Sequence, residues 1–156
     1  MTKDELKALI ERKFAGKLTF CESGKFDPMY EAKPEDVLEI ARALRDDEQL
    51  RFDYCNNIAA VDTTETFEMV YNLSSTVHNL RLDFKTVLSH DKPEIESVQE
   101  VWAGANWFER EAWELYGIDI KNHGNLTRFL LPEDWDQGFP MRKDWDAPDF
   151  VRMPEL

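Results

Sequence analysis

Residues 107–116 read Trp-Phe-Glu-Arg-Glu-Ala-Trp-Glu-Leu-Tyr, and Gly117 follows them. On a helical wheel, at about 100° per residue, most of the apolar side chains fall on one continuous arc. That arc holds Leu115, Phe108, Ala112, Tyr116 and Trp113, and the opposite side holds Glu111, Glu114 and Arg110. Glycine suits the position just after a helix, where the backbone turns left-handed. The stretch therefore predicts a helix over about residues 106–116 that packs one face on a core.

Two side chains do not fit this helix. Glu109 lies inside the apolar arc, and a buried carboxylate without a partner is costly. We therefore predict that Glu109 pairs with a cation, Arg128 or Arg142, and fixes the C-terminal segment against the helix. The alternative is an acid–base carboxylate with a shifted pKa. Trp107 lies on the charged side, and we expect a partner protein or the C-terminal segment to cover it.

The residues before this helix predict an α/β domain over residues 1–118. Thr2 and Glu5 have the spacing of a capping box, so a first helix should start at Thr2. Pro34 suits the start of a second helix, because its missing N–H costs nothing there. The apolar face of the second helix consists of Val37, Leu38, Ile40, Ala41 and Leu44.

Alternation of polar and apolar residues predicts the strands. Residues 17–21 alternate, and 29–32 are expected as a short edge strand because Pro28 precedes them. Three longer segments, 51–61, 65–73 and 77–87, alternate with one polar face and favour an antiparallel meander. The predicted fold class is therefore α+β, a mixed and largely antiparallel sheet packed by helices.

Residues 119–156 have a different character. They hold two tryptophans and four of the seven prolines, and they show little periodicity. The segment is too aromatic for a disordered tail and too irregular to build its own core. We predict that residues 119–156 form an extended C-terminal arm that packs on another surface. The alternative is a segment that folds back on its own domain.

Composition disfavours several classes of function. The net charge of −13 opposes binding to nucleic acids and to anionic lipid surfaces. No apolar run approaches the roughly 18 residues that span a bilayer. Cys21 and Cys55 lack the spacing of zinc or iron–sulfur ligands, and His78, His90 and His123 lie in three separate segments. Phosphate-binding and nucleophile motifs are also missing. We therefore expect no catalytic residue, no metal site and no bound cofactor in this chain.

Two separate motifs can be compared with known families. The first consists of Glu109, Arg110, Glu111, Glu114, Leu115, Tyr116, Gly117 and Ile118. The second begins with Arg128, Phe129, Leu130 and Leu131 and continues with Gly138, Phe139, Pro140, Met141, Arg142, Lys143, Asp144 and Trp145. Both motifs resemble the 30 kDa subunit family of complex I, the NADH–quinone oxidoreductase. The chain departs from the family at Phe139, where histidine is usual, and at Asn122-His123-Gly124, where the family has Gly-His-Pro. Related subunits occur in membrane-bound hydrogenases and in F420H2 dehydrogenases.

The resemblance implies a non-catalytic assembly subunit of the hydrophilic arm of a respiratory NADH:quinone oxidoreductase, an ion-translocating enzyme. It implies an arm docked on the large quinone-site subunit, which is hydrogenase-large-subunit-like, and neighbouring iron–sulfur subunits in the same hetero-oligomeric complex. Iron–sulfur clusters, flavin and quinone are then expected in partner subunits. The complex would lie at the cytoplasmic face of the cell membrane, with this chain peripheral.

We expect recognition of the partner to depend on the arm. Its cations are Arg128, Arg142 and Lys143, and its aromatic anchors are Trp135, Phe139 and Trp145. On the helix, the candidate partner-binding or structural residues are Trp107, Glu109, Arg110 and Glu111. Three alternatives stay open: the equivalent subunit of a hydrogenase or F420H2 dehydrogenase, a free-standing enzyme using Glu109, Glu111 and Asp144, and an acidic binding module outside any redox complex.

Overall fold

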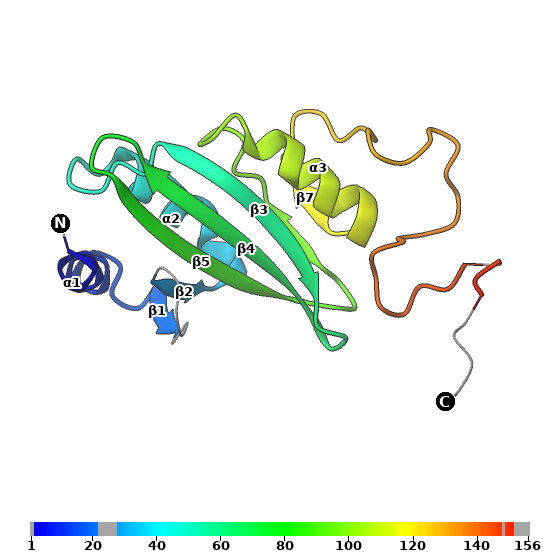
Figure 1. The fold of residues 1–156 in the computed structure, drawn as a ribbon, viewed down its shortest axis with the longest axis horizontal. Helices are drawn as coiled ribbons and strands as arrows, with labels where there is room; N and C mark the ends of the chain where they lie inside the picture. Colours follow the sequence, from blue (N-terminus) through cyan, green and yellow to red (C-terminus); the bar gives the residue numbers. More distant parts are fainter. Residues whose placement is uncertain (1, 22–27, 148, 152–156) are drawn as a thin grey trace.

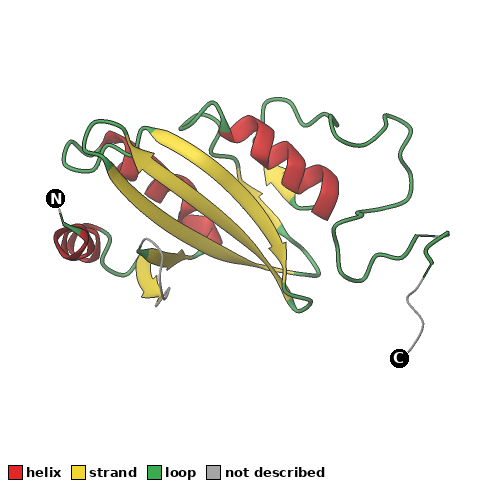
Figure 2. Cartoon of the chain, in the orientation of Figure 1, coloured by secondary structure: helices red, strands yellow, loops and turns green. Residues whose placement is uncertain are grey.

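The computed structural model describes residues 2–21, 28–147 and 149–151. Its elements in chain order are α1 (Lys3–Lys13), β1 (Leu18–Cys21), β2 (Met29–Ala32), the 3-10 turn η1 (Pro34–Asp36), α2 (Val37–Asp46), β3 (Tyr54–Asp62), β4 (Thr66–Ser75), β5 (Leu80–Ser89), β6 (Glu94–Glu96), α3 (Ala105–Tyr116) and β7 (Asp119–Lys121). The predicted fold class, a mixed sheet packed by helices, is confirmed (Figures 1 and 2).

Local signals place the helices as predicted. Thr2 and Glu5 form the capping box, in which each side chain accepts the backbone N–H of the other residue. Pro34 starts the 3-10 turn that leads into α2. Gly117 ends α3 in a left-handed conformation, with φ of 71°.

The main sheet has the strand order β1-β2-β5-β4-β3. Strands β3, β4 and β5 form the predicted antiparallel meander. The prediction of an edge position for β2 is wrong, because β2 lies between β1 and β5 and runs parallel to β5. Pro28 does not prevent this, since it precedes the first paired residue and its carbonyl accepts the N–H of Asp83.

One face of the sheet forms the core. Along β4, Phe67, Met69, Tyr71 and Leu73 are buried and the residues between them are half-exposed. The period of two therefore separates a covered face from an open one. Helix α2 lies behind the sheet in the view of Figure 1, and α3 lies along β3.

Strands β6 and β7, which precede and follow α3 in the chain, form a separate two-stranded parallel sheet. The sequence did not predict β6, because three residues are too short for a periodic signal. Residues 119–121 pair within the domain as β7, so the arm begins at Asn122 rather than at Asp119. The arm consists here of residues 122–151 without residue 148, and its predicted end, residues 152–156, lies outside the described residues.

The arm has no helix or strand within its described residues and runs as a wide loop beyond the end of α3 (Figure 2). Within the described ranges, no helix combines the length and the apolar character that crossing a bilayer requires.

Candidate functional site

The arm packs on the charged side of α3, opposite the apolar arc of the helical wheel. Arg110 donates from Nε to the carbonyl of Thr127 at 2.8 Å. The carboxylate of Glu114 accepts the backbone N–H groups of residues 129–131, the shortest from Leu131 at 2.6 Å. Both side chains are buried, and Glu114 is only 3% exposed. The wheel places Arg110 and Glu114 opposite the apolar arc, and the arm buries them there because a wheel describes packing on the core and not packing by the arm.

The arm also completes the last turn of α3. The final carbonyls of a helix have no partner within the helix. The carbonyl of Leu115 accepts the N–H of Met141 at 3.1 Å, and the carbonyl of Tyr116 accepts Nε of Arg142 at 2.6 Å. Two stretches of the arm, near 127–131 and 139–143, are thus fixed to the same helix.

Phe139 packs at the point where α3 ends. A Cβ on Gly117 would lie 2.5 Å from the Phe139 ring, so the absence of a side chain at 117 lets the ring approach the backbone. The guanidinium of Arg142 lies 4.7 Å from the centre of the Phe139 ring and 5.1 Å from that of Phe67. Stacking on two rings fixes the orientation in which Arg142 reaches the helix end.

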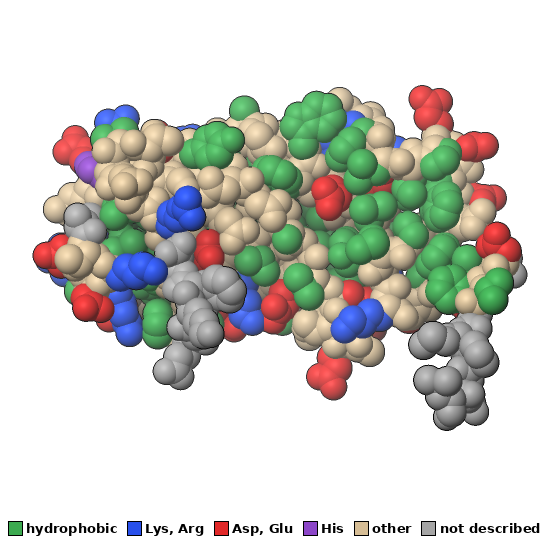
Figure 3. Space-filling model, in the orientation of Figure 1, with side chains coloured by type: hydrophobic (Ala, Val, Ile, Leu, Met, Phe, Trp, Pro, Cys, Tyr) green, Lys and Arg blue, Asp and Glu red, His purple; other side chains and the backbone are tan. Residues whose placement is uncertain are grey.

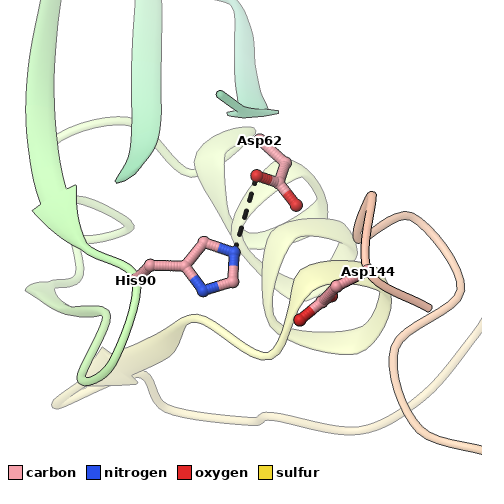
Figure 4. Close-up of side chains that lie close together, drawn as sticks. All are labelled: Asp62, His90 and Asp144. Carbon is pink, nitrogen blue, oxygen red and sulfur yellow. Dashed lines mark ion pairs between the residues drawn. The ribbon is translucent and has the colours of Figure 1, made fainter. Parts of the chain in front are cut away.

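A third attachment connects the arm to the sheet. Asp62, at the end of β3, is buried and accepts the N–H groups of Thr64 at 2.7 Å and Lys143 at 2.8 Å. His90 points its ring at Asp62, with Nε2 3.5 Å from Oδ1, and Asp144 approaches from the arm (Figure 4). Burial by itself would raise the pKa of Asp62, but the bonds from Lys143, Thr64 and His90 lower it below its usual value. The carboxylate therefore joins a hairpin end to the arm.

Glu109 is buried, as predicted, but its partners are neutral. The side chain is 1% exposed and accepts the Ser97 hydroxyl at 2.6 Å and the Val98 N–H at 2.6 Å. Burial raises the pKa of Glu109 to about 7, although both hydrogen bonds act to lower it. His123 lies 3.8 Å away, and burial lowers the pKa of its ring. The site joins the loop after β6, helix α3 and the start of the arm.

The predicted pairing of Glu109 with Arg128 or Arg142 is wrong. Arg128 donates to the carbonyl of Trp135 at 2.7 Å, inside the arm, and Arg142 is held at the end of α3. A carboxylate near its own pKa can be protonated, so it needs no buried cation. Arg128 instead shapes the loop that the arm makes.

The predicted aromatic anchors also hold this loop. Trp135 donates from Nε1 to the carbonyl of Gly138, and Trp145 donates to that of Gln137. Their ring centres lie 6.3 Å apart. The indole N–H groups are therefore used within the arm, which stays ordered although it has no regular secondary structure.

The outer surface of this region is apolar. Figure 3 shows hydrophobic side chains gathered over the half of the molecule that contains α3 and the arm. The exposed apolar residues there are Trp107, Phe129, Leu130, Phe139, Met141, Phe150 and Val151. Trp107 packs edge-on against Phe129, with ring centres 5.3 Å apart, yet it remains 53% exposed. The arm thus contacts Trp107 without covering it, and Glu111 on the same helix is exposed.

Sequence reasoning missed Glu114 and Asp62 as residues that position the arm. Both bind backbone N–H groups, which carry no side-chain signal in a sequence. The position of Glu114 within the first motif was visible, but its function depends on residues 15 to 17 positions later.

Known proteins resemble the chain over most of its length. The family model described as "Respiratory-chain NADH dehydrogenase, 30 Kd subunit" matches residues 30–151. The C subunit of the NADH-quinone oxidoreductase of Citrifermentans bemidjiense is 37% identical over 148 residues, which are 93% of this chain and 90% of that protein. The protein of the same name from Roseiflexus castenholzii is 41% identical over 115 residues, 72% of this chain and 66% of that protein.

Two solved structures share the fold. A chain of the membrane-bound sulfane sulfur reductase, an archaeal respiratory membrane complex, has a TM-score of 0.78 and 21% identity, covering 93% of this chain and 86% of its own. The trypsin-resistant fragment of Nqo5 has a TM-score of 0.65 and 22% identity, covering 78% of this chain and 98% of its own. Because the family model matches residues 30–151 and the Citrifermentans bemidjiense protein is 37% identical over 148 residues, the chain belongs to the family of the 30 kDa subunit of respiratory-chain NADH dehydrogenase.

Proposed function

We propose that this chain is an assembly subunit of an NADH–quinone oxidoreductase and that it holds the large quinone-site subunit through its arm. The observation that carries the proposal is an ordered loop with an apolar outer surface. The buried carboxylates of Glu114 and Asp62 bind backbone N–H groups of the arm, and half-buried Arg142 bonds to the last carbonyl of α3. Leu130 and Met141 point outward, each 52% exposed. Side chains that stay exposed on a fixed backbone are suited to bury against a partner with little loss of entropy.

The charges around this apolar surface indicate which charges a complementary partner surface would carry. The exposed acidic residues of the arm are Glu133, Asp134, Asp136, Asp144, Asp146 and Asp149. Of the three cations of the arm, Arg128 and Arg142 are occupied within the chain by backbone carbonyls, and Lys143 is exposed. A complementary partner surface would have an apolar centre and lysine or arginine at its rim.

The proposal assigns no catalytic step and no cofactor to this chain. Cys21 lies on β1 and Cys55 on β3, which are the two opposite edges of the sheet, so they cannot ligate one iron–sulfur cluster. Glu109 is enclosed and bound by Ser97 and Val98, which leaves it no access to a substrate. Electron transfer to quinone, and the clusters and flavin it needs, then belong to partner subunits, with this chain peripheral at the cytoplasmic face of the membrane.

Substitution of the outward side chains tests the docking directly. We would replace Leu130 and Met141 together by serine, express the tagged chain in cells that lack the wild-type copy, and isolate it in mild detergent. We expect the co-purifying quinone-site subunit to fall by about tenfold or more, which corresponds to about 1.4 kcal/mol of binding free energy. A Val77→Ser variant is the matched control, because Val77 is 56% exposed but lies in the β4–β5 turn, far along the chain from the arm.

Truncation after Ile120 changes more of the structure. It also removes the backbone N–H groups that bond to the Glu114 carboxylate and to the carbonyl of Leu115 at the end of α3. The serine pair is free of that effect, since its backbone contacts stay in place. Normal recovery of the partner with the serine pair would contradict the proposal. Turnover by the isolated chain would instead support a free-standing enzyme.

A further inference from the structure

A groove of about 550 Å³ opens between the start of β3 and the N-terminus of α3. Its walls consist of Asp53, Tyr54, Cys55, Trp102, Ala103, Gly104, Trp107 and Phe108. Nothing in the three attachments of the arm uses this groove, although Trp107 belongs to both surfaces.

Two of the polar side chains in the walls have partners within the chain. Trp102 donates from Nε1 to the carbonyl of Phe52 at 2.8 Å. The carboxylate of Asp53 accepts the N–H of Thr76 at 2.8 Å and its hydroxyl at 2.5 Å. Burial raises the pKa of the Cys55 thiol to about 12, so the sulfur is uncharged. The groove therefore presents an apolar, mainly aromatic interior that suits an apolar side chain rather than an ion.

The rim is aromatic and exposed on both sides. Tyr54 is 57% exposed and Trp107 is 53% exposed. Tyrosine and tryptophan are the residues that most often carry binding energy at protein interfaces. Trp107 also packs against Phe129 of the arm, so it links the groove to the apolar surface of the arm.

Gly104 forms part of the wall, and the chain gives no steric reason for a glycine there. Its φ of −64° and ψ of −24° are ordinary for any residue. A Cβ at 104 would meet no atom within 4 Å. The helix start needs no ligand either, because the N–H groups of Ala105 and Trp107 already bond to the carbonyls of Trp102 and Gly104. The space above Gly104 is thus open toward the outside of the molecule.

We propose that this groove is a second docking site for the subunit that binds the arm, and that it receives an apolar side chain of that subunit. This inference rests on the proposed function, since continuity with the arm surface identifies the occupant. Two contacts on one rigid body, the arm and the groove, would fix the orientation of the chain as well as its attachment.

Gly104 allows a clean test, because a side chain can be added there without strain. Gly104→Trp should fill the groove, while Gly104→Ala should leave it open. Tyr54→Ser removes one wall without filling the space. Each variant would be expressed as the full chain in cells lacking the wild-type copy, and the partner retained in mild detergent would be measured. We expect Gly104→Trp to reduce the retained partner by about tenfold, Tyr54→Ser to reduce it less, and Gly104→Ala to match the wild type.

The thermal unfolding midpoint of each isolated variant should stay close to that of the wild type, which separates docking from folding. Full retention with Gly104→Trp, while the Leu130/Met141 serine pair loses the partner, would overturn the groove proposal and leave the proposed function standing. Full retention with both would overturn both proposals. If the isolated wild-type chain forms a dimer in sedimentation experiments and Gly104→Trp abolishes it, the occupant is a second copy and the proposal is wrong.

Discussion

The sheet and the arm reach an ordered structure by different means. Strands β3, β4 and β5 bury a continuous row of large apolar side chains, with Tyr71 stacked on Phe84 at 4.5 Å. The arm buries few side chains of its own and is fixed through its main chain by Glu114, Asp62 and the end of α3.

The two regions differ in which contacts supply the free energy that stabilises them. In the sheet it is spread over many contacts that form and break together, so a local defect weakens the whole domain. In the arm it depends on a few polar groups, so one substitution can release the arm while the domain stays folded. Four substitutions test this contrast, from the largest expected effect to the smallest.

Phe84→Ala should produce the largest loss. Phe84 is fully buried, and its removal leaves a cavity beside Tyr71. We expect the free energy of unfolding, measured by urea denaturation, to fall by about 3–5 kcal/mol. Val77→Ala, on the exposed turn, should change it by less than about 0.5 kcal/mol. A similarly small change for Phe84→Ala would mean that the core is not the source of stability.

Glu109→Gln should change how stability depends on pH. The pKa of Glu109 is about 7 in the folded chain and lies at its ordinary value of 4.5 when unfolded. The folded chain therefore binds the proton more tightly, and this group's contribution is full below pH 4.5 and is lost as pH rises to about 7. Glutamine does not titrate, so the Glu109→Gln variant does not lose this contribution. The free energy of unfolding of the variant, relative to that of the wild type, should therefore rise by up to about 3 kcal/mol between pH 5 and pH 8. Urea denaturation at both pH values measures this, and parallel changes in the two proteins would contradict it.

Glu114→Ala should release the first stretch of the arm. Three N–H groups lose a charged acceptor, and hydrogen bonds to charged groups contribute about 1.5–3 kcal/mol to stability. Amide hydrogen exchange should accelerate at residues 129–131 and much less in the sheet. Glu111→Ala, on the exposed side of the same helix, is the control and should leave exchange unchanged. Equal acceleration in β4 and β5 would show that the two regions unfold as one.

Gly117→Ala should have the smallest effect of the four. The left-handed conformation at 117 costs an L-residue about 1–2 kcal/mol, and the new Cβ would displace the Phe139 ring. We expect a lower thermal midpoint and faster proteolysis of the arm near residue 139. Gly104→Ala is the matched control, because its backbone is ordinary and its surroundings are open. An unchanged proteolysis rate would remove Phe139 from the attachment.

Local chemistry made most of the domain predictable from the sequence. The capping box of Thr2 and Glu5, the alternation along β4 and the glycine after α3 each act within a few residues, and each was found where expected. The position of β2 depends on residues 83–86, which pair with it from far along the chain. No short pattern contains that information.

The arm was predictable in kind but not in its contacts. Its aromatic, proline-rich character indicated an ordered and irregular segment, but not which groups would hold it. The burial of Glu109 followed from the wheel, whereas its partners Ser97 and Val98 lie in a loop without periodicity. The docking functions of Trp107, Trp135, Phe139 and Trp145 stay predictions.

The carboxylate of Glu114 binds main-chain N–H groups and makes no demand on the side chains that those residues carry. The side chain of Leu130, which is 52% exposed, can therefore change without removing the hydrogen bond that its backbone N–H donates to Glu114. Under the proposed docking function, the exposed side chains of the arm could change as the partner diverges, while the hydrogen bonds that fix the backbone of the arm stay in place.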